Sequence, residues 1–180
     1  AAALETSGSG SDWVREDAAR LYTAAGRPGD AARLVTIAAR SAVSAHDREQ
    51  GLARAVALLG TPTHQQAWLA AAVEHLEWTV RCGWARVAGG ALSVAKGLAA
   101  DAPRGGDFRH RLLLAEARLR LLAGRWADAA ALAERILAVP AADGNERLAH
   151  DQAAAVAAQA RWATGDAEGA SRLLVPVLND

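Results

Sequence analysis

The chain has 180 residues, with 20 basic and 20 acidic side chains and a formal net charge of zero. A general nucleic-acid-binding domain would show a basic excess, so the charge balance argues against that function. Alanine accounts for 48 of the 180 residues, and there is no Met, one Phe and one Tyr. Because strands favour β-branched and aromatic residues, an all-β fold is nearly excluded. The single cysteine, Cys82, excludes an internal disulfide framework, and no apolar run reaches the length of a membrane span.

Residues 1–10 differ in composition from the rest of the chain. They end in alternating Ser and Gly, which is typical of a flexible linker, and residues 1–5 resemble translated vector sequence. We therefore interpret residues 1–10 as a linker or vector-derived scar and residues 11–180 as one folded domain. An alternative is that residues 1–6 are a peptide fused through the Ser-Gly linker so that it docks on the domain.

Helical periodicity runs through the chain from Asp12 onward. Apolar residues recur at steps of three and four, as at Leu112, Ala115, Leu119 and Leu122. Gly and Pro interrupt this pattern at regular distances, where Gly can end a helix with a positive φ. The pattern predicts nine helices joined by short loops, so neighbouring helices should be antiparallel. The predicted ranges are 12–25, 29–44, 47–59, 63–82, 84–100, 107–123, 126–139, 145–163 and 166–178.

Four of the predicted turns share one pattern, in which a helix ends at Gly and a small residue follows five positions later. The four glycines are Gly26, Gly83, Gly124 and Gly165, and the differences 124 − 83 and 165 − 124 are both 41. A fixed period of about 20–50 residues is typical of a helical-repeat solenoid. In a solenoid, stacking buries the apolar face that a single hairpin would expose to solvent.

The best copy of this pattern resembles the tetratricopeptide repeat. Ala117, Gly124, Trp126, Ala129 and Pro140 follow the family's order of small residue, Gly, aromatic, Ala and Pro. The period exceeds the family's usual length of about 34 residues. Long-period copies resemble the helical repeats of large bacterial regulators, such as ATP-binding LuxR-type activators and other signal-transduction ATPases. The resemblance implies an all-α fold, a right-handed superhelical stack of about four antiparallel helical hairpins.

The first part of the chain does not fit the period, because Gly26 and Gly83 are 83 − 26 = 57 residues apart. One explanation is that 47–59 is an extra helix. The other is that Gly60 ends the first helix of a shorter repeat and that 84–100 is the unpaired helix. The sequence leaves both open.

Catalytic and metal-binding motifs are not found. The sequence contains neither a Gly-rich phosphate loop followed by Lys-Ser or Lys-Thr nor a His-Glu-x-x-His zinc motif, and its five His never pair at i,i+4. We interpret Glu74, His75 and Glu77 as solvated helix surface, and Cys82 as a small buried residue at a helix end. The sequence therefore predicts a non-catalytic domain with no metal and no cofactor.

The register of the repeat implies that one face of each first helix lines a concave groove. Arg111 and Arg118 lie on the same helix beside Leu114, which suits an acidic or C-terminal peptide with an apolar anchor. The alternative is that both are ordinary solvated arginines, and the family's Asn-containing carboxylate clamp is not reproduced. The predicted groove residues are Trp13, Glu16, Arg20, Glu77, Arg111, Leu114, Arg118, Gln152, Gln159 and Trp162.

The expected function is a protein- or peptide-interaction or sensor module of a larger cytoplasmic bacterial regulator, without nucleic-acid or membrane binding by this domain alone. The 19 Arg against one Lys, together with the abundant Ala, suggest a high-GC bacterial genome. The alternative is a receptor for an apolar or aromatic small molecule, which a closed Trp-lined pocket above about 300 Å³ would favour. The apolar residues between Leu173 and Leu178 also predict self-association through the last helix.

Overall fold

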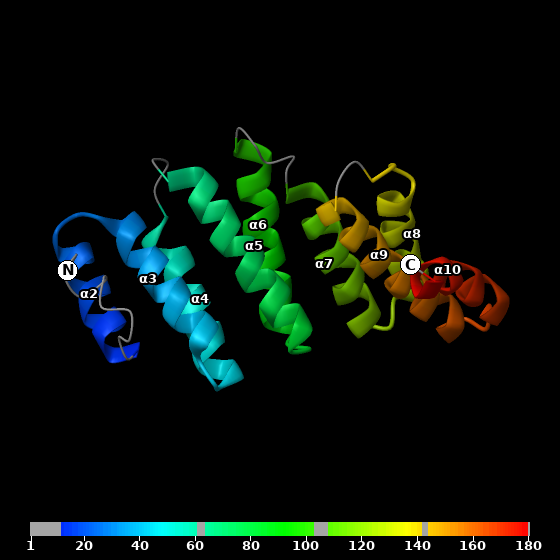
Figure 1. Cartoon of the computed structure of the whole chain (residues 1–180), viewed down its shortest axis with the longest axis horizontal. Helices are drawn as coiled ribbons and strands as arrows, with labels where there is room; N and C mark the ends of the chain where they lie inside the picture. Colours follow the sequence, from blue (N-terminus) through cyan, green and yellow to red (C-terminus); the bar gives the residue numbers. More distant parts are fainter. Residues whose placement is uncertain (1–11, 61–63, 103–107, 142–143, 180) are drawn as a thin grey trace.

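The computed structural model describes residues 12–60, 64–102, 108–141 and 144–179, and these ranges form nine helices and no strand (Figure 1). The helices are α2 (Asp12–Ala24), α3 (Pro28–Ser41), α4 (Ala45–Leu58), α5 (Gln65–Arg81), α6 (Ala85–Asp101), α7 (Arg109–Leu122), α8 (Trp126–Leu137), α9 (Gly144–Ala163) and α10 (Ala167–Asn179). Each predicted helix is present with its ends within three residues of the prediction, which confirms the all-α class. The predicted linker at residues 1–10 lies outside the described residues.

Four helix pairs are joined by the same tight turn. Gly26, Gly83, Gly124 and Gly165 have φ values of 69°, 73°, 70° and 88°. In each turn the residue after the glycine donates its backbone N–H to the carbonyl five residues earlier, as Trp84 does to Thr79 at 3.0 Å. This is the arrangement by which a helix C-terminus satisfies its last carbonyls, and it favours Gly because other residues are strained at positive φ. The hairpins are thus α2–α3, α5–α6, α7–α8 and α9–α10.

Helix α4 is the extra helix. Gly60, which follows it, does not adopt a positive φ, whereas Gly83 does. Helix α4 packs against α3 on one side and α5 on the other (Figure 1). Its insertion accounts for the 57 residues between Gly26 and Gly83, so the first of the two explanations offered by the sequence is the one observed.

The buried apolar residues form three successive clusters rather than one centre. The first joins α2, α3 and α4, with Ala71 of α5; the second joins α5, α6 and the start of α7; the third joins α7, α8 and α9. Trp68 packs against both of the first two clusters. The helices therefore follow one another along the long axis of the molecule (Figure 1), as expected when each hairpin buries its apolar face on the next.

Small residues at the helix interfaces allow neighbouring helices to pack closely. Ala31, Ala55, Ala88, Ala117 and Ala129 are each fully buried. At Gly51 of α4, a Cβ atom would lie 2.7 Å from the Cβ of Ala39 on α3, so only glycine permits the observed approach of these two helices.

Candidate functional site

The first helices of three consecutive hairpins lie next to one another. Helix α5 contacts α7, and α7 contacts α9. Two adjoining hollows follow this row of helices, and we call them together the α5–α7–α9 groove. The smaller hollow has a volume of about 130 Å³ and is lined by Glu77, Val80, Arg81, Arg111, Leu114, Ala115, Arg118 and Gln152. The larger has a volume of about 370 Å³ and is lined by Val80, Arg118, Leu121, Leu122, Trp126, Gln152, Ala155, Val156 and Gln159.

Arg111 is held by a carboxylate across the helix interface. Its Nε and Nη2 atoms donate to Oε1 and Oε2 of Glu77 on α5, each at 2.7 Å. This two-bond geometry matches a planar guanidinium to a planar carboxylate. The hydrogen bonds to Glu77 raise the pKa of Arg111 above its usual value, and they outweigh the opposing effect of burial. Arg111 thus joins α7 to α5 and has its charge compensated within the protein.

Arg118, two turns further along α7, has a different environment. Its Nη2 atom donates to the Gln152 side-chain Oε1 of α9 at 3.2 Å. Among the described residues, it forms no ion pair with a carboxylate. Burial lowers the pKa of Arg118, and the positive charge of Arg81 lowers it further. The negative charge of Glu77 opposes both effects but does not outweigh them, so the groove contains a half-buried guanidinium that has no ion-pair partner among the described residues.

Arg81 is a second arginine of this kind in the groove. It is the last residue of α5, it is exposed, and it has no carboxylate partner in the described part of the chain. Its guanidinium carbon lies 6.0 Å from the ring centre of Trp78, over which Arg48 also stacks at 4.1 Å. The smaller hollow thus contains three arginines and one glutamate, a formal charge of +2.

The structure brings together six of the ten predicted groove residues. Those lining the α5–α7–α9 groove are Glu77, Arg111, Leu114, Arg118, Gln152 and Gln159. Trp162 lies at the end of α9 with 70% of its surface exposed, outside the lining of both hollows. Arg20 is exposed and pairs with Asp17 of its own helix at 3.4 Å. The side chain of Trp13 lies outside the described residues.

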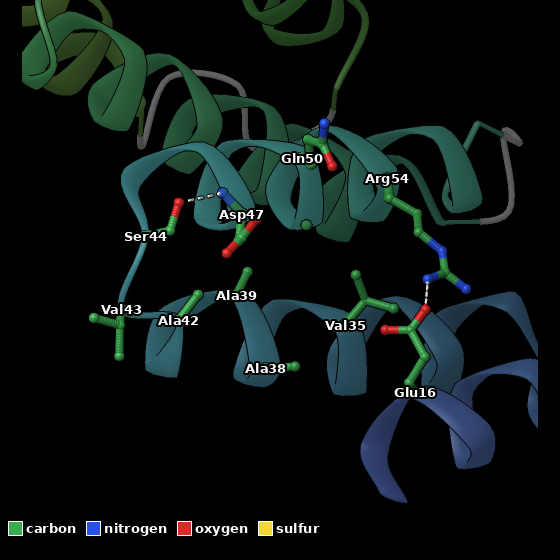
Figure 2. Close-up of a pocket in the computed structure, with 11 residues that line it drawn as sticks. Glu16, Val35, Ala38, Ala39, Ala42, Val43, Ser44, Asp47, Gln50 and Arg54 are labelled. Carbon is green, nitrogen blue, oxygen red and sulfur yellow. Dashed lines mark hydrogen bonds and ion pairs between the residues drawn. The ribbon is translucent and has the colours of Figure 1, made fainter. Parts of the chain in front are cut away.

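Glu16 belongs to another part of the surface. It forms an ion pair with Arg54 of α4 at one end of a hollow of about 670 Å³ beside α3 and α4. Figure 2 shows Val35, Ala38 and Ala39 of α3 along this hollow. Because α4 stands between α3 and α5, the inserted helix separates α2 from the row of first helices. The predicted continuation of the groove onto α2 therefore does not occur.

The predicted groove set omits several residues that line the groove, among them Arg81, Leu122 and Trp126. Arg81 is at a helix end, beyond the positions that the repeat register assigns to the groove. Leu122 and Trp126 flank the turn at Gly124, and Trp126 occupies the aromatic position of the repeat motif. Trp126 does pack against the third cluster, but it is only partly buried and one side lines the larger hollow. The signal that could have found these residues is the Gly turn itself, because it places the ends of both helices beside the groove.

The described residues contain no group of three His, Cys, Asp or Glu side chains that could hold a metal ion. Within the part of the chain that the structure describes, no helix combines the length and apolar content needed to cross a bilayer. Comparison of the chain with protein-family models, with curated proteins and with solved structures gave no match.

Proposed function

We propose that this chain is a non-catalytic interaction module that binds a peptide segment of a partner protein in the α5–α7–α9 groove. In this proposal the hairpins form a right-handed, tetratricopeptide-like superhelix, and the module belongs to a larger cytoplasmic bacterial regulator. The repeated Gly turn, the 41-residue period and the contacts between successive first helices support it. In such a stack the row of first helices is the surface that a partner meets.

The observation that carries the proposal is the composition of the groove. One hollow offers Arg81 and Arg118 without carboxylate partners in the described residues, and the adjoining hollow offers Leu121, Leu122 and Trp126. Peptide-binding surfaces combine apolar pockets, which supply most of the affinity, with a few charged groups that fix orientation. The two hollows share Val80, Arg118 and Gln152, so one extended segment can occupy both.

The alternative of a Trp-lined receptor for a small aromatic molecule finds less support in the geometry. The larger hollow of the groove contains one Trp, Trp126, and the hollow beside α3 and α4 contains none. Trp162, one of the predicted groove residues, is mostly exposed. The larger hollow is also open to solvent at Leu122, which is 48% exposed.

A selection from a random peptide library displayed on phage tests the proposed function. The immobilised wild-type domain is compared with Ala155→Trp, in which the new ring would fill the larger hollow from an exposed position of α9. The matched control is Ala131→Trp, which places the same ring at an exposed position of α8 outside both hollows. Circular dichroism melts establish that both variants fold.

We expect the wild type and Ala131→Trp to enrich the same peptides and Ala155→Trp to lose them. Absence of enrichment by the wild type, or equal enrichment by all three proteins, would show that the groove is not a peptide-binding surface.

A further inference from the structure

We propose that α10 of one copy of this chain docks parallel to α6 of a second copy, where Val175 lies against a hollow between α4 and α6. The proposal goes beyond peptide binding, because neither surface belongs to the lining of the α5–α7–α9 groove. The apolar residues of the last helix predict self-association, and the structure supplies the surface that receives them.

The receiving surface is a hollow of about 250 Å³ between α4 and α6, which both pack on α5. The only polar side chain in its described lining is His75, whose Nε2 lies 3.0 Å from Oε1 of Glu49. Sites for drug-sized molecules usually measure about 300–1,000 Å³, so this hollow suits side chains of a protein better than a separate ligand. Its lining consists of Ala53, Val56, Ala72, His75, Gly90, Ala91 and Val94.

The hollow continues into an open apolar strip along α6. Val87 and Val94 are 40% and 45% exposed, and they alternate with Gly90 and Gly97 at steps of three, four and three residues. A Cβ atom added at either glycine would meet no described atom within 4 Å, so the backbone of α6 is accessible there. The strip would therefore allow a second helix to approach closely, as Gly51 does between α3 and α4.

Helix α10 has a face with the same spacing. Glu168, Ser171, Val175 and Leu178 are all exposed and also follow one another at steps of three, four and three residues. This spacing places them on one side of the helix, and such a face is the form in which a helix binds in an apolar groove. Aligned in parallel, the two helices place Val175 beside Val94 of the hollow.

The charges of the two surfaces favour this parallel orientation. Arg86 lies four residues before Gly90 on the strip and has no carboxylate partner among the described residues. The Glu168 side chain is 84% exposed, and its carboxylate is 3.9 Å from Arg172, which is a long ion pair. In the parallel orientation Glu168 lies beside Arg86, whereas in the antiparallel orientation it lies toward Asp101 at the other end of α6. Opposite charges at this position would fix the direction of docking.

The docking surfaces lie on different helices of one copy, so two variants with complementary defects can be mixed. The Val175→Glu and Leu178→Glu double variant loses the docking face of α10 and keeps the hollow. Gly90→Leu keeps α10, and its new side chain would fill the hollow from an open position. The matched control is Gly89→Leu, which adds the same side chain at the next exposed position of α6, outside the lining. Circular dichroism melts establish that each variant folds.

Sedimentation over a range of concentrations measures the mass of each protein and of the mixture. We expect the wild type and Gly89→Leu to exceed the monomer mass of 18.7 kDa, and each defective variant alone to stay at it. An equimolar mixture of the two defective variants should form a one-to-one complex, because the intact α10 of Gly90→Leu can dock on the intact hollow of the double variant. A folding defect in either variant would not be repaired by mixing.

Charge reversal tests the parallel orientation. Arg86→Glu should weaken the association about 5-fold or more, because it places two carboxylates side by side. Combining it with Glu168→Arg in the same chain should restore the affinity, since the pair is then reversed in every copy. Failure of this restoration would overturn the parallel orientation.

Three outcomes would overturn the docking itself. They are a wild type that stays monomeric at every concentration, a Gly90→Leu variant that associates as the wild type does, and a mixture that stays monomeric. Peptide binding in the groove is judged separately, because Ala155→Trp should lose the selected peptides and still associate as the wild type does.

Discussion

Arg111 on α7 donates to both carboxylate oxygens of Glu77 on α5, at 2.7 Å each. The pairing compensates the charge of Arg111, whereas Arg118, on the same helix, donates to the neutral amide of Gln152 at 3.2 Å. Two arginines that look equivalent in the sequence, on the same helix and two turns apart, therefore have different roles. We interpret the first as structural and propose the second for binding.

The different environments of these two arginines predict different effects of their substitution on stability. Arg111→Gln should lower the free energy of unfolding by about 0.5–1 kcal/mol, since the ion pair with Glu77 is partly exposed and such pairs are weak. Arg118→Gln should cause no loss, because it removes a charge that burial and Arg81 disfavour. Urea denaturation of both variants measures the difference. A larger loss for Arg118→Gln would mean that Arg118 is ion-paired in solution.

Two glycine substitutions test the packing of the inserted helix. Gly51→Ala would place a Cβ 2.7 Å from Ala39 and should destabilise the protein by about 1–3 kcal/mol through overpacking. Gly97→Ala, within α6, meets no atom within 4 Å and should stabilise it by about 0.5–1 kcal/mol through better helix propensity. Thermal and urea unfolding of both variants check these signs. Equal effects would show that α3 and α4 are less closely packed than the structure indicates.

The buried carboxylate of Glu116 predicts a dependence of stability on pH. Burial alone would raise the pKa of Glu116, but hydrogen bonds from Lys96 and Arg120 outweigh it and place this pKa below 4.5. Charged Glu116 therefore stabilises the folded state above pH 4.5, and this contribution is lost as the pH falls through the lowered pKa. Glu116→Gln should cost about 1 kcal/mol at neutral pH.

The same substitution should cost progressively less as the pH falls below 4.5. Parallel urea denaturation series for the wild type and Glu116→Gln at neutral and acidic pH measure the change. A difference that stays constant across the series would contradict the ion pairing of Glu116 with Lys96, whose Nζ lies 2.7 Å from Oε2.

The exposed apolar side chains of α10 can be substituted to test the predicted self-association. Val175 and Leu178 are 51% and 79% exposed, which leaves apolar surface for a second copy of the chain. Light scattering over a range of concentrations should show a mass above the monomer value of 18.7 kDa for the wild type, and the monomer mass for Val175→Glu with Leu178→Glu. A wild type that stays at the monomer mass throughout would rule the interface out.

Much of the fold follows from the sequence because its causes are local. A helix forms through backbone hydrogen bonds between residues four apart in the sequence. The periodicity of apolar residues therefore predicts all nine helices of the described residues, with ends within three residues of those observed. The positive φ that a turn requires favours Gly, so the spacing of Gly83, Gly124 and Gly165 predicts where three hairpins bend. The register within each first helix likewise places Leu114 and Arg118 of α7, and Gln152 of α9, on the side that lines the groove.

Only the tertiary structure determines which side chains meet between neighbouring helices, because these contacts depend on how one helix lies against another. Glu77 and Arg111 are 34 residues apart, and only the packing of α5 on α7 brings their side chains into contact. The insertion of α4 between α3 and α5 likewise removes Glu16 from the groove, although its sequence position fits the register. Periodicity describes each helix by itself, whereas the pairing of Arg118 with the neutral amide of Gln152 instead of a carboxylate results from which neighbours the stacked helices bring together.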